Sequence, residues 1–128
     1  MSLPSEILVV DDDAAVCTFM QHALEGRGYH VWTAHSGSEA LTVLDQRGRD
    51  LRLLLTDVIM PDMTGPALAT AAGRALPGLR VLYVSGYRGA YSDQVPAAVC
   101  LEKPFTATQL LERVQALIAS DEDTSQVH

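Results

Sequence analysis

The sequence has few cysteines, few aromatic residues and a shortage of positive charge. Its 128 residues include two cysteines, too few for a four-cysteine zinc site or a disulfide framework. We expect Cys17 and Cys100 to be small buried residues in a reducing compartment. Nine Lys and Arg stand against sixteen Asp and Glu, a formal net charge of −7. This balance disfavours direct binding to nucleic acid, whose phosphates require positive partners.

Long hydrophobic runs are also absent. No apolar run approaches the roughly 18 residues that a transmembrane helix needs. The N-terminal residues "MSLPSE" lack a basic region that leads into an apolar one. We therefore expect a cytoplasmic protein without membrane insertion. Hydrophobic residues still make up 48% of the chain and charged residues 20%, a composition typical of one globular domain with a buried core.

Short apolar runs alternate with longer amphipathic segments. The runs are residues 7–10, 30–34, 51–56, 79–85 and 97–102. Uninterrupted apolar strands are typical of a parallel sheet that is covered on both faces. Helix-start signals stand between the runs: Asp13, the capping-box pattern Ser36 to Glu39, Gly65–Pro66, and Thr106 with Gln109. The pattern predicts a doubly wound α/β fold.

Two segments depart from this alternation. Residues 86–96 contain two Gly and a Pro and have little apolar periodicity, so any helix there is expected to be short. Residues 120–128 are acidic and polar. We expect one domain over residues 5–119, followed by a flexible acidic tail over 120–128.

Polar residues follow the apolar runs at four strand ends. Residues 11–13 are three consecutive Asp after the first run, and Asp57 follows the third. Ser85 ends the fourth run, and Lys103 follows the fifth. In an open α/β sheet, ligands bind beyond the carboxyl ends of the strands. We therefore expect these side chains to meet in one crevice.

Several carboxylates in one partly dry crevice repel each other unless a cation joins them. A hard divalent cation with oxygen ligands satisfies this need, and Mg²⁺ fits best because it combines one or two carboxylates with waters and a phosphate. An Asp can itself be the nucleophile and form an aspartyl phosphate. Lys103 would add positive charge for the transferred oxygens, and Ser85 a hydroxyl donor.

Each of these residues alone also has an ordinary structural explanation. The Asp run could cap a helix, and Asp57 could end a strand at a turn. Ser85 with Gly86 could be a common turn, and Lys103 could lie in an exposed loop. Their joint placement at four strand ends of one predicted sheet favours a phosphoryl-transfer site.

The motifs "ILVVDDD" (7–13), "LLLTDVIMPDMTG" (53–65), "VLYVSGY" (81–87) and "LEKPF" (101–105) together resemble a response-regulator receiver domain, the phosphoacceptor module of two-component signalling. The pattern is more similar to receivers attached to hybrid sensor histidine kinases than to those fused to DNA-binding domains. The resemblance implies a flavodoxin-like, five-stranded parallel sheet of order 2-1-3-4-5 with helices on both faces. It covers nearly all of residues 5–119.

The resemblance implies a role for each matching residue. Asp57 would accept the phosphoryl group from a phosphohistidine on a sensor histidine kinase or a histidine phosphotransfer domain. Asp12, Asp57 and the backbone carbonyl of Ile59 would bind Mg²⁺, and Asp11 would act through water. Phosphorylation would then switch contacts with a downstream protein, in a phosphorelay.

Ser85 and Lys103 match the hydroxyl and the cation that contact the phosphoryl group, and the Lys103–Pro104 bond matches one that is cis in the family. Two positions depart from the family pattern. Cys100 replaces the aromatic residue that usually stands three positions before the lysine, and residues 86–96 interrupt the region of the family's fourth helix. Both departures put the usual switch in doubt.

Competing functions remain. A haloacid-dehalogenase-type phosphatase needs a second Asp two residues after the nucleophile, where this chain has Ile59. A degenerate receiver, acting as a phosphorylation-independent interaction module, would be expected to lose Asp12, Asp57 or Lys103, and all are present. We expect no conventional enzyme, only assistance to its own phosphorylation and slow dephosphorylation. The kinase, the target and homodimerisation through the last helix are left open.

Overall fold

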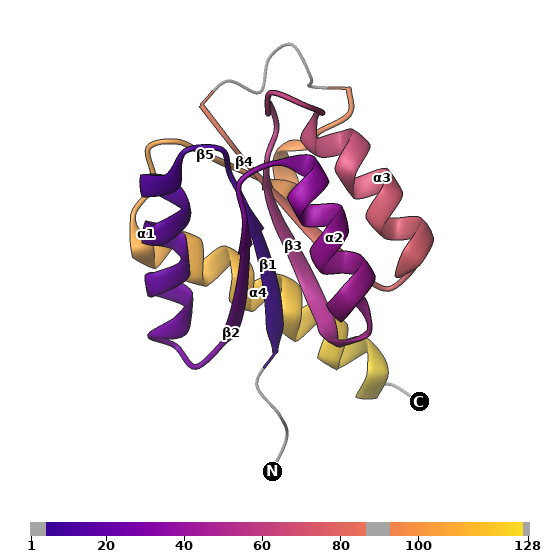
Figure 1. Ribbon diagram of the computed structural model, residues 1–128. Helices are drawn as coiled ribbons and strands as arrows, with labels where there is room; N and C mark the ends of the chain where they lie inside the picture. Colours follow the sequence, from indigo (N-terminus) through magenta and orange to yellow (C-terminus); the bar gives the residue numbers. More distant parts are fainter. Residues whose placement is uncertain (1–4, 87–92, 127–128) are drawn as a thin grey trace.

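A computed structural model describes residues 5–86 and 93–126. It contains a five-stranded parallel sheet of order β2-β1-β3-β4-β5, as expected (Figure 1). The strands are β1 (Glu6–Val10), β2 (His30–Ala34), β3 (Leu51–Asp57), β4 (Arg80–Ser85) and β5 (Cys100–Glu102). The helices are α1 (Ala14–Glu25), α2 (Gly37–Arg47), α3 (Gly65–Ala75) and α4 (Ala107–Gln126), with 3-10 turns at Gly48–Asp50 and Ala97–Val99.

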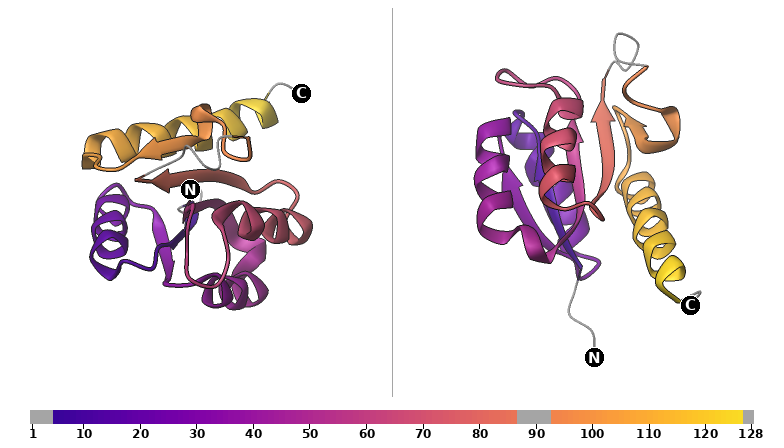
Figure 2. Two further views of the ribbon diagram at one scale, coloured as in Figure 1. Left: turned by 90° about the horizontal axis from the view of Figure 1, so that it is seen from above. Right: turned by 90° about the vertical axis from the view of Figure 1, so that its right-hand side faces the viewer.

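Helices cover both faces of the sheet, and the core is divided accordingly. On one face, α1 and α4 pack on alternate residues of the strands, including Ile7, Leu53 and Leu82. On the other, α2 and α3 pack on Leu8 and Leu54. The right-hand view of Figure 2 shows α2 and α3 on one side of the sheet and α4 on the other. Burial on both faces explains why the strands read as continuous apolar runs.

The helices begin where the sequence signals predicted. Asp13 accepts hydrogen bonds from the N–H groups of residues 15 and 16, and Thr64 accepts one from residue 67. The Ser36 hydroxyl accepts from the Glu39 N–H, while the Glu39 carboxylate accepts from the N–H of residue 35. Thr106 and Gln109 form a reciprocal capping box at α4. These bonds satisfy N–H groups that a helix leaves unpaired at its start.

Two boundaries differ from expectation. The fifth strand is three residues long, because Pro96 is followed by a 3-10 turn over Ala97–Val99 before β5 begins. Helix α4 continues to Gln126 rather than ending near residue 119. Residues 120–126 contain no Gly or Pro that would stop a helix, so the acidic segment expected to be a tail is helical up to that point.

The interrupted segment after β4 is described in part. Residues 93 and 94 form a turn, and no α-helix is present within the described residues between β4 and β5. The rest of the segment, residues 87–92, lies outside the described ranges. Within the described chain, no helix is long and apolar enough to cross a membrane.

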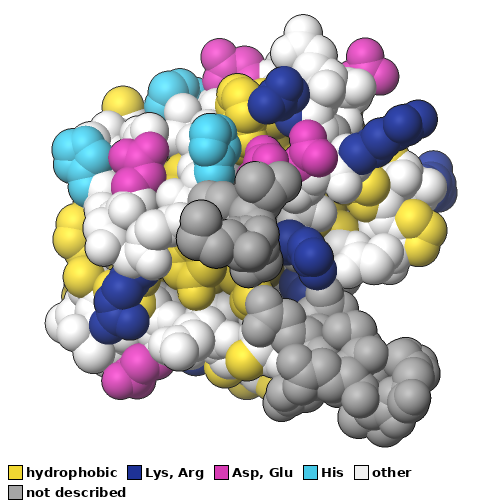
Figure 3. All heavy atoms as spheres, turned by 90° about the horizontal axis from the view of Figure 1, so that it is seen from below, with side chains coloured by type: hydrophobic (Ala, Val, Ile, Leu, Met, Phe, Trp, Pro, Cys, Tyr) yellow, Lys and Arg dark blue, Asp and Glu magenta, His cyan; other side chains and the backbone are white. Residues whose placement is uncertain are grey.

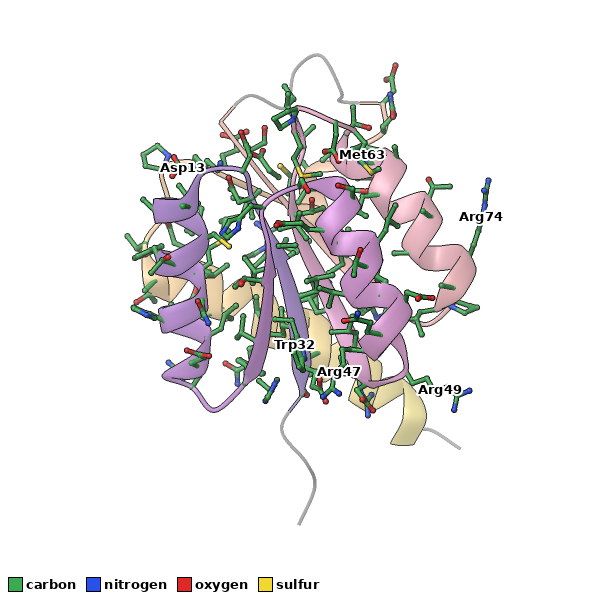
Figure 4. All side chains as sticks on the ribbon, viewed as in Figure 1. Asp13, Trp32, Arg47, Arg49, Met63 and Arg74 are labelled. Carbon is green, nitrogen blue, oxygen red and sulfur yellow. The ribbon has the colours of Figure 1, made fainter. Side chains whose placement is uncertain are left out.

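Figure 3 shows the end of the molecule at the amino termini of the strands, seen from below. Positively charged side chains lie there among Asp, Glu and His side chains. Arg47 and Arg49 extend at the lower end of the molecule, and Arg47 lies over the ring of Trp32 at 4.4 Å (Figure 4). The residues predicted to form the site lie at the opposite end, where the strands terminate.

Candidate functional site

The carboxyl ends of β1 and β3 bring three carboxylates together. These strands are neighbours in the sheet, with Val10 paired to Thr56, so the residues that follow each strand meet. One oxygen from each of Asp11, Asp12 and Asp57 lies within 4.8 Å of the others. The predicted convergence of the acidic pair with Asp57 is therefore confirmed.

Asp11 is fully buried, and both of its oxygens are engaged. Oδ1 accepts a hydrogen bond from the backbone N–H of Asp13 at 2.9 Å, and Oδ2 accepts one from Nζ of Lys103 at 3.0 Å. Asp12, in contrast, is exposed at the mouth of the crevice. Asp12 is thus accessible to a ligand from solvent, whereas both carboxylate oxygens of Asp11 accept hydrogen bonds within the protein.

Lys103 is the cation of the crevice and the only lysine in the sequence. Its Nζ lies 3.0 Å from Asp11 and 3.4 Å from Oδ2 of Asp57. Burial favours the neutral amine, but the hydrogen bond to Asp11 and the charges of Asp11 and Asp57 outweigh it and raise the pKa of Lys103. The Lys103 N–H also donates to the carbonyl of Ser85 at 2.8 Å, which joins the lysine to the end of β4. The Lys103–Pro104 bond is cis, as the resemblance implied.

Asp57 ends β3 with its carboxylate partly buried. Burial raises the pKa of Asp57, the charge of Asp11 raises it further, and the ion pair with Lys103 offsets part of the increase. The backbone of Ile59 also offsets part of the increase in the pKa of Asp57. On the main-chain side, the buried Thr56 hydroxyl donates to the Asp57 carbonyl at 2.9 Å. The acceptor candidate is therefore held from both sides.

Ser85 and Ile59 lie at the rim of the same crevice. Ser85 is buried at the end of β4, one residue beyond Val84, which pairs with Asp57. Ile59 lies two residues past Asp57, with its side chain 51% exposed and its backbone bridged to Thr64. The strand pairing thus places Ser85 and Lys103 on one side of Asp57, and the loop with Ile59 follows β3 directly.

Sequence reasoning missed the contacts of Asp62. Its carboxylate accepts hydrogen bonds from the N–H groups of Gly37, at 3.0 Å, and Ser38, at 2.9 Å, at the start of α2. These bonds hold the pKa of Asp62 below its usual range. The sequence offered a turn-forming context for Asp62 but no signal of its partners, which lie 24 and 25 residues earlier.

The position of the expected aromatic switch is filled by a small apolar cluster. Cys100 is buried with Val58, Tyr83 and Val95. Tyr83 is paired with Cys100 across β4 and β5, and its side chain is buried. Among the described residues, the aromatic side chain in this cluster therefore comes from β4. Both cysteines are buried, as predicted, and neither forms a disulfide within the described residues; burial raises the pKa of the Cys17 thiol to about 11.

The donor set fits a hard divalent cation. Three carboxylates in close proximity supply the oxygen ligands that Mg²⁺ prefers, and a metal ion would neutralise charge that Lys103 balances in part. A partly buried Asp beside a cation and a candidate metal site is an arrangement suited to phosphoryl transfer. The fold and site together define a phosphoacceptor-type α/β domain.

Comparison with known proteins specifies the family. The family model "Response regulator receiver domain" matches residues 7–115, so the chain belongs to that family, and it functions as a receiver domain of two-component signalling. The response regulator receiver protein CpdR of Brucella abortus is 33% identical over 116 residues, covering 88% of this chain and 95% of that protein. The sensor kinase CckA of Brucella abortus is 34% identical over 122 residues, or 92% of this chain.

Solved structures agree with the fold. The receiver domain of hybrid histidine kinase CckA is 35% identical with a TM-score of 0.77, covering 88% of this chain and 98% of that one. A receiver domain protein from Methanospirillum hungatei is 31% identical with a TM-score of 0.84, covering 96% and 99%. The chain spans 13% of the length of CckA, but almost the whole of CpdR. Receiver domains interact with histidine kinases or phosphotransfer proteins.

Proposed function

We propose that Asp57 accepts a phosphoryl group from a phosphohistidine of a sensor histidine kinase or a histidine phosphotransfer domain. The observation that supports this most directly is the position of its carboxylate, partly buried between Asp11, Asp12 and Lys103. An Asp57 oxygen would form a bond to phosphorus while the phosphorus–nitrogen bond breaks. The bonding electrons and a proton would then remain on the imidazole.

Mg²⁺ is the metal we propose for the acidic cluster. Asp12, Asp57 and the Ile59 carbonyl would hold it directly, and Asp11 through water. The engagement of both Asp11 oxygens by Asp13 and Lys103 supports this division of roles. When bound, Mg²⁺ supplies charge stabilisation to the transferred phosphoryl oxygens.

Lys103 and Ser85 would contact the phosphoryl oxygens once the aspartyl phosphate has formed. Lys103 already bridges Asp11 and Asp57, so a phosphorylated Asp57 would present it with additional negative charge. Ser85 is joined to Lys103 through the backbone, which supports a coupled response of the two residues. Phosphorylation would then change contacts with a downstream protein.

An apolar surface beside the crevice supports a protein as the phosphodonor. Ala15, Val16 and Phe19 of α1 line a cavity of about 440 Å³ together with Lys103, Pro104 and Phe105. The side chain of Phe19 is 44% exposed, and its ring centroid lies 6.0 Å from that of Phe105. Because Lys103 borders both this surface and the crevice, a phosphohistidine domain seated here would lie next to Asp57.

The alternative of a phosphorylation-independent interaction module is not favoured, because Asp12, Asp57 and Lys103 are all present and converge. A cytoplasmic location, the absence of direct nucleic-acid binding and any homodimerisation stay predictions. We also retain the view that the chain assists only its own phosphorylation and slow hydrolysis, rather than acting as a conventional enzyme.

The test is intact-protein mass after incubation with acetyl phosphate, with and without Mg²⁺, beside the variant Asp57→Asn. We expect one phosphoryl adduct that requires both Mg²⁺ and Asp57. An adduct of unchanged yield in Asp57→Asn would show that another residue is the acceptor. If no adduct formed although Mg²⁺ bound, the interaction-module alternative would replace our proposal.

A further inference from the structure

Residues 57–65 form one closed loop between β3 and α3, which we call the acceptor loop. At its base, the Gly65 N–H donates to the Val58 carbonyl at 2.7 Å, and Ile59 is bridged to Thr64. The turn between these contacts contains the buried Met60 and the exposed Asp62. Because the loop is closed, a displacement of its turn would also move Ile59.

Asp62 ties that turn to another element. Its two carboxylate oxygens each accept one hydrogen bond, from the N–H groups of Gly37 and Ser38. Helix α2 has a local cap as well, since the Ser36 hydroxyl accepts from the Glu39 N–H at 3.1 Å. Two acceptors from different segments thus serve one helix start, and of these two acceptors only Asp62 belongs to the acceptor loop.

Met63 strengthens this connection through packing. A Cβ atom added to Gly37 would lie 2.3 Å from Cγ and 2.5 Å from Sδ of Met63, so the Met63 side chain rests directly on the Gly37 backbone. Met63 lies at the upper end of the molecule, beside the starts of α2 and α3 (Figure 4). Hydrogen bonds and packing therefore converge on the same point of α2.

The acceptor loop depends on such contacts because one of its key groups is not packed. The Ile59 side chain is 51% exposed, so packing of that side chain contributes little to the position of its backbone carbonyl. In the proposed function that carbonyl is a metal ligand, three residues before Asp62. Groups that orient metal ligands from outside the coordination shell commonly affect metal affinity.

We propose that Asp62 is a positioning residue: by binding the start of α2 it holds the acceptor loop in the conformation that presents Asp57 and the Ile59 carbonyl to Mg²⁺. This inference rests on the proposed function for the role of the metal. The tether itself is independent of phosphoryl transfer, and the two can be tested separately.

The experiment compares Asp62→Ala, Asp62→Asn and the matched control Ser36→Ala in the full 128-residue chain. Asp62→Ala and Ser36→Ala each remove capping from α2, but only the first releases the acceptor loop. Asp62→Asn keeps one acceptor oxygen. The readouts are Mg²⁺ affinity by calorimetry and amide hydrogen exchange of residues 58–64.

We expect Asp62→Ala to weaken Mg²⁺ binding about tenfold, as loss of an outer-shell partner commonly does. Exchange in the acceptor loop should accelerate, with partial recovery in Asp62→Asn and no loop effect in Ser36→Ala. Equal effects of Asp62→Ala and Ser36→Ala on Mg²⁺ affinity and loop exchange would overturn the inference, because they would show that Asp62 acts only as a cap of α2. Unchanged loop exchange in Asp62→Ala would overturn it as well.

Failure of the proposed function can be distinguished from failure of the inference about Asp62. If the proposed function is wrong, the unmodified chain should form no phosphoryl adduct with acetyl phosphate. Loop exchange would still test the tether in that case. Faster exchange in Asp62→Ala than in Ser36→Ala would support it, and equal exchange in all variants would reject it.

Discussion

The two flanks of Asp57 are held by different forces. On one flank, the acceptor loop is fixed by directional hydrogen bonds that Thr56 and Gly65 donate and that Asp62 accepts. On the other, Tyr83, Val95 and Cys100 form the β4–β5 flank, an apolar cluster that packs against Val58 at the start of the acceptor loop. Hydrogen bonds require a particular geometry, whereas apolar contacts depend mainly on the area removed from water.

This contrast suggests that the acceptor loop serves metal binding and phosphoryl transfer, and that the β4–β5 flank serves the conformational response to phosphorylation. A metal ligand and a nucleophile must be placed accurately, and the hydrogen-bonded loop provides that. A switch must have a second arrangement of similar free energy, and a small cluster of side chains can repack at low cost. We therefore expect changes in the acceptor loop to impair phosphorylation and changes in the β4–β5 flank to impair its consequences.

The largest expected effect comes from Gly65→Ala, which would break the base of the acceptor loop. A Cβ at this position would lie 2.3 Å from the Asp57 carbonyl oxygen, and the obstacle is backbone, so the loop or β3 must shift. We expect a loss of about 3 kcal/mol in the free energy of unfolding, measured by urea titration, because overpacking typically costs about 1–3 kcal/mol.

Gly73→Ala in α3 is the matched control for that variant. Nothing lies within 4 Å of a Cβ at Gly73, which is exposed in the helix. The same substitution should there raise the free energy of unfolding by roughly 0.5–1 kcal/mol. Similar losses in both variants would contradict the special role of the Gly65 contact.

Lys103→Ala is expected to have the next largest effect, since it removes the cation that connects the two flanks. Leaving the buried Asp11 without this partner should cost about 2 kcal/mol, in the range for hydrogen bonds to charged groups. Because a positive charge leaves the acidic cluster, Mg²⁺ should bind more tightly, while the response to phosphorylation weakens. Calorimetry measures the first change, and chemical shift differences on phosphorylation measure the second.

Lys103 offers a sharp control because the sequence has no other lysine. Labelling with ¹⁵N-lysine gives one side-chain signal, which should move when Mg²⁺ is added and again when the chain is phosphorylated. A signal that moved in neither step would count against a role for Lys103 in the crevice.

Much of the fold was accessible from sequence because it depends on local patterns. Continuous apolar runs predicted the strands, and parallel strands place their carboxyl ends together, so Asp11, Asp12, Asp57 and Lys103 could be grouped in advance. The end of α4 was missed because residues 120–126 favour no helix strongly but contain nothing that stops one. In a polar segment, the absence of Gly and Pro does not by itself predict that a helix continues.

The tether of the acceptor loop could not have been predicted in the same way. The bonds from Gly37 and Ser38 to Asp62 join residues 24 and 25 positions apart through an exposed turn. Their formation depends on the path of that turn, which local propensity leaves undetermined. The same holds for Tyr83, whose pairing with Cys100 follows from the register of β4 and β5 and not from either segment alone.

The variant Asp57→Asn tests whether the negative charge of the Asp57 carboxylate lowers the thermal stability of the metal-free chain. Burial and the charge of Asp11 raise the pKa of Asp57, so the metal-free folded state binds this proton more tightly than the unfolded chain. The associated stability is present below the unfolded-state pKa and is lost as pH rises through the folded-state pKa. At neutral pH, Asp57→Asn should therefore melt a few degrees higher than the unmodified metal-free chain.

Two observations would check that assignment. The stabilisation by Asp57→Asn should shrink as the pH falls toward the ordinary range of a carboxyl group. Added Mg²⁺ should raise the melting temperature of the unmodified chain much more than that of the variant. A metal-free variant that melted lower at neutral pH would contradict the view that ionisation of Asp57 is unfavourable in this crevice.

The smallest effect is expected for Cys100→Ala in the β4–β5 flank, and it tests the proposed division most directly. The substitution removes one sulfur from a buried cluster, at a cost of about 1 kcal/mol. It leaves the acceptor loop and the ion pairs of Lys103 in place, so the rate of phosphorylation by acetyl phosphate and Mg²⁺ affinity should be unchanged. Chemical shift changes around Tyr83 on phosphorylation should differ, because Tyr83 packs against this position. A slower rate of phosphoryl acceptance, with an unaltered response around Tyr83, would show that the two flanks are not divided in this way.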